Sequence, residues 1–346
     1  MKRLFRKTAK VALVLIYLVI IAGAVVRMTG SGMGCPDWPK CFGYYIPPTE
    51  LSELQFKPNH DYTKGIVIIV NEALQVSKES FKSGDTLNLN NWEPYTAHDY
   101  AIFNPLHTWV EYINRLLGAL SGIPILIFTI MSIWLWKDDK RFLILSIFTV
   151  VAMGFQAWLG KTVVDSNLSP YKITVHMVMA LVIVAVILYL IFLAKTHFKN
   201  QKFDKLFKNV LIVATLLTLV QIVLGTQVRQ YVDDQIKSIG YIKPLWLQNP
   251  QLEFYVHRSL SILVLLINLW LFQRNRKYNL GYAKFNLVLI GISLEILTGI
   301  AMFYFDFPFA TQPLHLVIAT LIIGIQFYII LESSRRSPAE IKLSST

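Results

Sequence analysis

Charged residues are scarce in this chain. Asp, Glu, Lys and Arg make up 16% of its 346 residues, whereas hydrophobic residues make up 54% and the mean hydropathy is +0.49. A composition this apolar excludes an ordinary soluble protein. The formal net charge is +12, but the chain has no basic patch away from the ends of its apolar segments. We therefore expect no nucleic-acid partner.

Long apolar segments are abundant instead. A helix of about 17–25 mostly apolar residues suffices to cross a bilayer. Segments of that kind occur at 11–29, 107–136, 142–161, 173–194, 210–229, 254–272, 285–305 and 314–331. The sequence thus predicts an all-α polytopic membrane protein with eight transmembrane helices in contact with membrane lipid.

The basic residues predict the orientation of these helices. Most of the 33 lysines and arginines lie at the two termini and in the connections at 137–141, 195–209 and 273–284. By the positive-inside rule, both termini are expected in the cytoplasm. The chain has no Arg- and Ser-rich amphipathic leader of the mitochondrial kind, so we expect the inner (plasma) membrane of a bacterium.

A short polar motif occurs twice. Glu111-Tyr112-Ile113-Asn114-Arg115 begins the second apolar segment and returns 143 residues later as Phe254-Tyr255-Val256-His257-Arg258. A Gly-x-x-x-Arg sequence precedes each copy. After each copy come a polar residue four positions before a glycine and then a histidine. The matching positions are Gly23 and Arg27 with Gly225 and Arg229, Gln156 and Gly160 with Glu295 and Gly299, and His176 with His315. Such self-similarity predicts a duplicated unit.

We therefore expect two pseudosymmetric four-helix bundles, an N-terminal half at 1–195 and a C-terminal half at 196–346. The first half contains a polar insert at 42–106 with no run long enough to span the membrane. We expect this insert to form an extracytoplasmic cap of low regularity. Residues 1–24 resemble a signal peptide, but cleavage would remove one element of the repeat, so we expect the first helix to be retained.

Only two cysteines are present, Cys35 and Cys41. The expected topology places both on the outer side of the membrane, where a disulfide between them is favoured. Such a bridge either staples the loop or takes part in redox chemistry, and both interpretations stay open. Two thiols without nearby histidines fall short of the four ligands of a structural zinc site.

Polar residues inside the apolar segments are candidate functional residues, because they are costly in a bilayer. Glu111, Asn114 and Arg115 lie just inside the second segment. The alternative is an ion pair between Glu111 and Arg115, four residues apart on the helix, that has only a structural role. Because His257 replaces Asn114 in the second copy, we favour a shared pocket geometry over that alternative.

His176, His257 and His315 lie at similar depths near the outer ends of their segments. Each alone could be an interhelical hydrogen-bonding residue. Two histidines from facing helices, however, can bind haem iron at both axial positions. The C-terminal half has the pair His257 and His315, whereas the N-terminal half has His176 with Asn114 opposite, and an amide is a poor iron ligand. We expect the iron in the C-terminal half to have a histidine on both sides and to serve electron transfer or structure. We expect the iron in the N-terminal half to have a histidine on one side only and to be the site of chemistry.

These residues resemble those of the haem A synthase family, over all eight segments. The similarity is carried by Gly23 to Cys41 (GAVVRMTGSGMGCPDWPKC), Glu111-Tyr-x-x-Arg115, Gln156-Ala-Trp-Leu-Gly160, His257-Arg258 and Gln312-Pro-Leu-His315. The glycine-rich motif that ends in two cysteines is the most specific of these.

The resemblance implies a b-type haem bound in the C-terminal half by His257 and His315. It implies that the N-terminal half takes haem O and oxidises its C8 methyl to the formyl group of haem A, which cytochrome c oxidase needs. His176 and Glu111 match functional residues of the substrate side. Asn114 stands where many members have histidine. Haem O synthase and cytochrome c oxidase assembly factors are the expected protein partners.

Glu111 is our candidate for the group that accepts a proton during methyl oxidation. The motif arginines are expected either to neutralise haem propionates or to pair with loop carboxylates, namely Arg27, Arg115, Arg229 and Arg258. Two rival functions remain. A di-haem b-type electron-transfer protein should have complete histidine pairs in both halves, and Asn114 argues against it. A haem transporter is less favoured, because the repeats are parallel and the polar groups gather at one membrane face.

Overall fold

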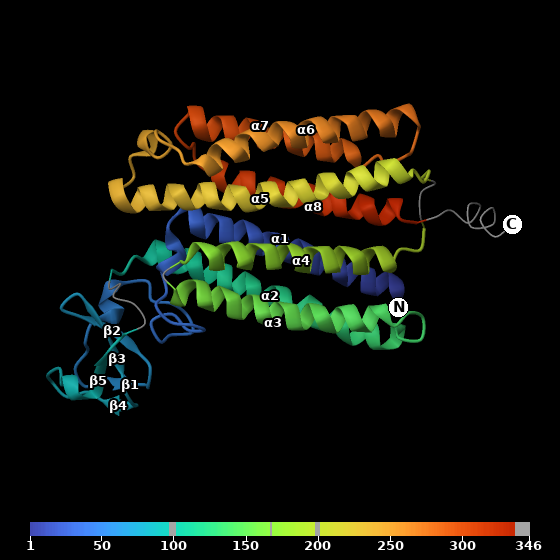
Figure 1. Cartoon of the computed structure of the whole chain (residues 1–346). Coiled ribbons are helices and arrows are strands. Elements are labelled where there is room, and N and C mark those ends of the chain that lie inside the picture. Colours follow the sequence, from blue (N-terminus) through green and yellow to red (C-terminus); the bar gives the residue numbers. More distant parts are fainter. Residues whose placement is uncertain (97–101, 167, 198–200, 336–346) are drawn as a thin grey trace.

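The computed structural model describes residues 1–96, 102–166, 168–197 and 201–335 (Figure 1). Eight long helices in this part of the chain are apolar enough to cross a membrane. They are α1 (Lys2–Met28), α2 (Pro105–Leu135), α3 (Arg141–Asp165), α4 (Pro170–Leu193), α5 (Lys205–Ile239), α6 (Leu252–Lys277), α7 (Phe285–Tyr304) and α8 (Thr311–Ser333). The prediction of an all-α protein with eight membrane-spanning helices is therefore confirmed.

Local sequence signals set several helix ends. Asn104 caps α2 by accepting hydrogen bonds from the backbone N–H groups of Leu106 (3.0 Å) and His107 (3.3 Å), and Pro105 occupies the first turn. Asp204 caps α5 in the same way. Both choices satisfy N–H groups that have no partner within the helix.

Helix α5 is longer than its apolar segment. It continues past residue 229 to Ile239. The extension carries Gln230, Asp233 and Asp234 on its polar side, so hydropathy alone cannot detect it. This extension brings Asp233 next to Arg27 of α1.

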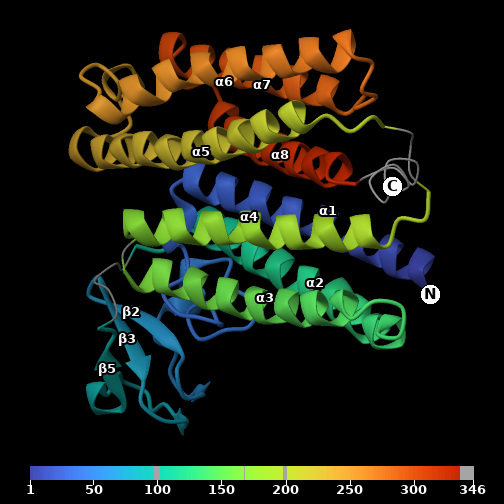
Figure 2. The same cartoon turned by 45° about the vertical axis from the view of Figure 1, so that its right-hand side comes forward.

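Each half forms a four-helix bundle. Consecutive helices pack together within α1 to α4 and within α5 to α8, and the first and fourth helix of each half are also in contact. Helix α8 packs against α1 and α4, which joins the halves along their length (Figures 1 and 2). The order of packing is the same in both halves; the pseudo-twofold relation between them stays a prediction.

The two largest apolar clusters of the helices extend to the same end of the bundle. Phe5 near the start of α1 contacts Phe128 and Phe142 edge-to-face, with ring centres 5.5 and 5.1 Å apart. In the second half, Phe207 stacks on Tyr282 at 4.9 Å. These residues lie near the end where α1 begins and α8 finishes (Figure 1). The candidate histidines lie towards the opposite end, and assigning either end to the cytoplasm stays a prediction.

The insert is more regular than expected. Strands β2 (Val67–Val70), β3 (Ala73–Ser77) and β5 (Trp92–Pro94) form one antiparallel sheet, and β1 (Asp61–Tyr62) pairs with β4 (Phe81–Lys82). The β2–β3 turn is Asn71-Glu72, both at positive φ (49° and 62°), as a two-residue hairpin requires. This turn lacks the glycine that usually marks such hairpins in sequence. Short 3-10 helices lie at Ser31–Met33, Leu51–Leu54, Leu89–Asn91 and Lys243–Leu245.

Candidate functional site

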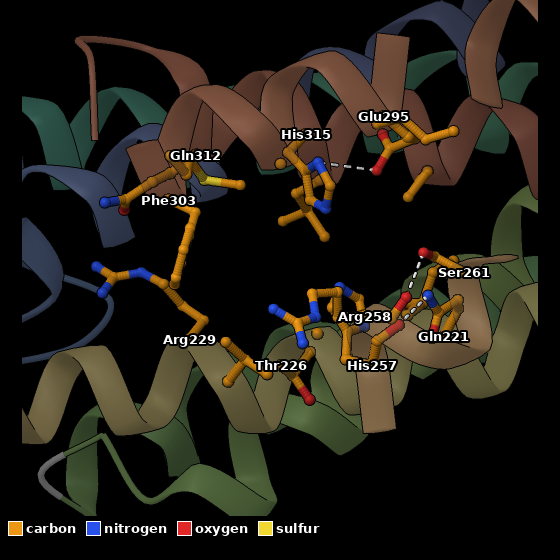
Figure 3. A pocket seen from close by; sticks show the side chains of 18 of the residues that line it. Gln221, Thr226, Arg229, His257, Arg258, Ser261, Glu295, Phe303, Gln312 and His315 are labelled. Carbon is orange, nitrogen blue, oxygen red and sulfur yellow. Dashed lines mark hydrogen bonds and ion pairs between the residues drawn. The ribbon is translucent and has the colours of Figure 1, made fainter. Parts of the chain in front are cut away.

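A cavity of about 360 Å³ lies within the C-terminal half. Residues of α5, α6, α7 and α8 form most of its wall, and Figure 3 shows the polar side chains that enter it. Ala24 and Arg27 of α1 and Met177 of α4 contribute to the wall from the N-terminal half. The cavity is therefore lined by residues of both halves of the chain.

His257 of α6 and His315 of α8 face each other across this cavity (Figure 3), with ring centres 6.3 Å apart. An imidazole nitrogen binds a first-row metal at about 2 Å and its ring centre lies about 1 Å further back, so one metal ion between two rings separates their centres by about 6 Å. In the described part of the chain, no cluster of three or more His, Cys, Asp or Glu side chains could bind a metal ion. The pair thus fits a metal that brings its own equatorial ligands, as haem iron does.

Residues of α7 hold the His315 ring. Its Nδ1 lies 3.0 Å from Glu295 Oε2 and 2.8 Å from Thr298 Oγ1. When Nδ1–H donates to the carboxylate, the lone pair of Nε2 is left for the cavity. Helix α5 supports His257 differently, because Gln221 Nε2 donates to its backbone carbonyl at 2.7 Å.

Glycines adjoin both rings, and one of them makes room for its ring. A Cβ at Gly225 would lie 3.3 Å from His257 Cε1, which is a tight contact, whereas one at Gly299 would lie 3.8 Å from His315 Cε1, which is an ordinary contact. Several buried polar atoms around the cavity have no hydrogen-bond partner in the described structure: Gln221 Oε1, His257 Nδ1, Glu295 Oε1 and Gln312 Oε1. Because such atoms are rare in proteins, they mark polar positions in a largely apolar wall at which a ligand or water can bind.

Arg229 and Arg258 lie on the same side of the histidine pair (Figure 3), and Arg27 also lines the cavity. Arg27 and Arg229 both pair, at 2.9 and 2.7 Å, with Asp233, which is a carboxylate of α5 and not of a loop. Arg258 instead lies over the rings of Phe254 and Tyr255, its guanidinium carbon 5.7 and 5.4 Å from their centres. Within the described residues it makes no ion pair, which leaves its charge for an anionic ligand group.

The N-terminal half repeats this scaffold around His176. Gln156 Nε2 lies 3.3 Å from His176 Nε2 and donates to the His176 carbonyl at 3.0 Å. A Cβ at Gly160 would lie 3.3 Å from His176 Cε1, and one at Gly23 would lie 3.8 Å from Asn114 Oδ1. Asn114 Oδ1, Gln156 Oε1 and His176 Nδ1 are buried without partners in the described structure. Buried polar atoms without partners therefore recur at the equivalent positions of the N-terminal half.

Glu111 is buried and fully engaged. Its Oε2 accepts from the backbone N–H of Cys35 at 2.9 Å, and its Oε1 accepts from Arg115 at 2.5 Å. Arg115 also donates to the carbonyls of Asp37 (2.7 Å) and Lys40 (3.0 Å). The ion pair between Glu111 and Arg115, which the sequence analysis disfavoured, is therefore present, and it also holds the loop from Cys35 to Cys41 against α2.

The disulfide between Cys35 and Cys41 is present, as expected, and both cysteines are buried. Thr108 Oγ1 of α2 donates to the Gly34 carbonyl at 2.8 Å. A Cβ at Gly34 would approach the His107 backbone to 2.5 Å, so only glycine permits this packing. Asp37 accepts from the N–H groups of Phe42 and Gly43 inside the loop, and burial raises its pKa above the usual value.

Three residues of the sites escaped sequence reasoning. Gln221 precedes Gly225 by four positions, which is the spacing of Gln156 and Gly160, so the repeat could have revealed it. Thr298 has no such signal, because threonine is common in apolar helices. Asp233 lies in the polar extension of α5, and only its contacts with the arginines show its role.

Comparison with known proteins covers nearly the whole chain. A family model described as cytochrome oxidase assembly protein matches residues 6–82 and 90–327. A protein named Heme A synthase from Ehrlichia canis is 24% identical over 339 residues, which cover 91% of this chain and 89% of that protein. Heme A synthases of Wolbachia pipientis wMel and Flavobacterium johnsoniae are 22% and 21% identical; each match covers 91% of this chain and 88% or 93% of the relative. The family match spans both halves and all the candidate residues above, and the chain belongs to the haem A synthase family.

Proposed function

We propose that this membrane enzyme oxidises the C8 methyl of haem O to the formyl group of haem A, for the assembly of cytochrome c oxidase in a bacterial inner membrane. The observation that carries the proposal is the facing pair His257 and His315 in a cavity of a chain whose relatives are named Heme A synthase. Haem O synthase and oxidase assembly factors are its proposed partners.

The proposed cofactor is haem b in the C-terminal half. His257 and His315 would bind its iron from opposite sides, and when bound it supplies a one-electron redox centre. Glu295 and Thr298 hold the His315 ring, while Gln221 holds the α6 backbone at His257. Arg258, which has no carboxylate partner in the described structure, would pair with a propionate.

The proposed substrate site is in the N-terminal half, where His176 would be the protein ligand to haem O. Asn114 lies where the other half has its second histidine, and an amide ligates iron poorly. This face of the substrate therefore stays open. Conversion of a methyl to a formyl group with water as the oxygen source would release four electrons and four protons, and an external electron acceptor would have to take up the electrons.

Glu111 is the proposed acceptor for one of those protons. In the structure its two oxygens are bound by Cys35 N–H and Arg115. Proton uptake at Glu111 would therefore weaken its hold on the disulfide loop, since a protonated carboxyl group pairs less strongly with a guanidinium. Proton transfer to Glu111 would thus be coupled to the docking of the Cys35–Cys41 loop on α2.

Pigment extraction tests the proposal. The full chain is expressed in a bacterial host that makes haem O but not haem A, and membrane haems are separated by chromatography. Haem A should appear with the wild-type chain and with His60→Ala, a control at an exposed histidine of the insert. It should be absent with His176→Ala. Folded, haem-loaded wild-type protein that yields no haem A would refute the proposed activity.

A further inference from the structure

The two histidines of the C-terminal cavity differ in what their outer nitrogens contact. His315 Nδ1 has a carboxylate oxygen of Glu295 at 3.0 Å and a hydroxyl of Thr298 at 2.8 Å. His257 Nδ1 is buried and has no hydrogen-bond partner in the described structure. Of the two outer ring nitrogens, only that of His315 therefore has a carboxylate in contact with it.

The equivalent position of the N-terminal half has no charge. Gln156 precedes Gly160 as Glu295 precedes Gly299, and its amide lies 3.3 Å from the ring of His176. A neutral amide at this position is thus enough to support a histidine. The carboxylate occurs only in the half that has two histidines.

The carboxylate of Glu295 is energetically costly at this position. Its side chain is only 17% exposed and lies within a membrane-spanning helix. In the described structure its carboxylate contacts the His315 ring, and no Lys or Arg side chain forms an ion pair with it. A carboxylate in apolar surroundings without a cationic partner is destabilising, so its presence indicates a role at His315 that an amide does not fill.

We propose that Glu295 is a positioning residue that fixes the tautomer of His315 and lowers the reduction potential of the metal centre bound there. The inference rests on the proposed haem b site. A carboxylate that accepts the outer N–H of a ligating histidine orients the ring and makes the ligand more basic. A more basic ligand and a nearby negative charge both favour the oxidised metal. The C-terminal centre is therefore a better electron donor with a carboxylate at position 295 than it would be with a neutral side chain there.

Optical redox titration of the purified, haem-loaded full chain tests this role. Glu295→Gln keeps the size of the side chain and removes the charge. We expect the haem b spectrum to persist. The ratio of oxidised to reduced centre at a fixed potential should fall about tenfold, which corresponds to a rise of about 59 mV in the reduction potential of a one-electron couple. Thr298→Val, which leaves the carboxylate in place, should shift the ratio less.

Glu332→Gln is the matched control. Glu332 is also a buried carboxylate of the C-terminal half, but it pairs with Lys195 and Lys284 at the opposite end of α8. Its substitution removes the same charge far from the cavity and should leave the titration within experimental error of wild type. An equal shift in both variants would show a general charge effect and overturn the specific role of Glu295.

The outcomes separate this inference from the proposed function. If Glu295→Gln holds haem b and titrates as wild type, the role of Glu295 is refuted while the cofactor site stands. If the wild-type chain holds no haem, or His257→Ala keeps an unchanged haem spectrum, the proposed site itself fails. If Glu295→Gln binds no haem, Glu295→Asp is titrated in its place. Its shorter side chain moves the carboxylate away from His315, so the ratio of oxidised to reduced centre at a fixed potential should fall, but by less than tenfold. An unchanged ratio in Glu295→Asp would overturn the inference.

Discussion

The contact between Glu111, Arg115 and the disulfide loop makes a quantitative prediction. Arg115 and Glu111 are 15% and 5% exposed in their side chains, and loss of one partner of a buried ion pair costs about 3–5 kcal/mol. Arg115→Ala removes the donor to the Asp37 and Lys40 carbonyls as well. If about 3 kcal/mol of this stabilises the docked loop, the undocked fraction rises at least about a hundredfold, since 1.4 kcal/mol is a factor of ten.

The assay is the rate at which the disulfide is reduced. Cys35 and Cys41 are buried, so a phosphine in solution reaches them only when the loop leaves α2. Alkylation and mass spectrometry of detergent-purified protein should show reduction at least about a hundredfold faster in Arg115→Ala. Lys161→Ala is the control, because the Lys161 and Asp165 pair has the same helical spacing but is 42% and 45% exposed. Equal rates in wild type and Arg115→Ala would refute the reasoning.

Four further results are expected. Glu111→Gln should abolish haem A formation while it keeps an oxygen that accepts from Cys35 N–H. If the disulfide of this variant is still reduced slowly, the loss of activity indicates that Glu111 acts in proton transfer; if it is reduced rapidly, the loss indicates that Glu111 acts by holding the loop on α2. His257→Ala or His315→Ala should each abolish the low-spin haem b spectrum, while His176→Ala keeps it and accumulates haem O. Asn114→His should preserve folding and haem b but change the spin state of haem bound in the first half, measured by electron paramagnetic resonance. Gly225→Val should displace the His257 ring and lower haem b content, whereas Gly154→Val, with no atom near its Cβ, should not.

The helices could be predicted because membrane spans depend on a local property, the length of an apolar run. The extension of α5 could not, since Asp233 and Asp234 resemble an ordinary polar loop in sequence. The β2–β3 hairpin was missed for a similar reason, because Asn71-Glu72 lacks the usual turn glycine. Local patterns thus fix what crosses the membrane but not what forms at its surface.

The histidines of the site could be predicted because each interrupts an apolar helix at a position related by the repeat. Their supporting contacts could not all be predicted. Glu111 meets the backbone of Cys35 from 76 residues away, and Arg27 meets Asp233 from 206 residues away. Such contacts depend on how the helices pack, and they decide whether a charged side chain holds the structure together or remains available to a ligand.

The cavity wall formed by Ala24, Arg27 and Met177 has a consequence for any attempt to divide the chain. Without α1 and α4 beside it, the C-terminal bundle would lack part of the wall on this side of the cavity. A fragment that begins at α5 is therefore expected to hold a ligand in this cavity less well than the full chain, even though it keeps both His257 and His315.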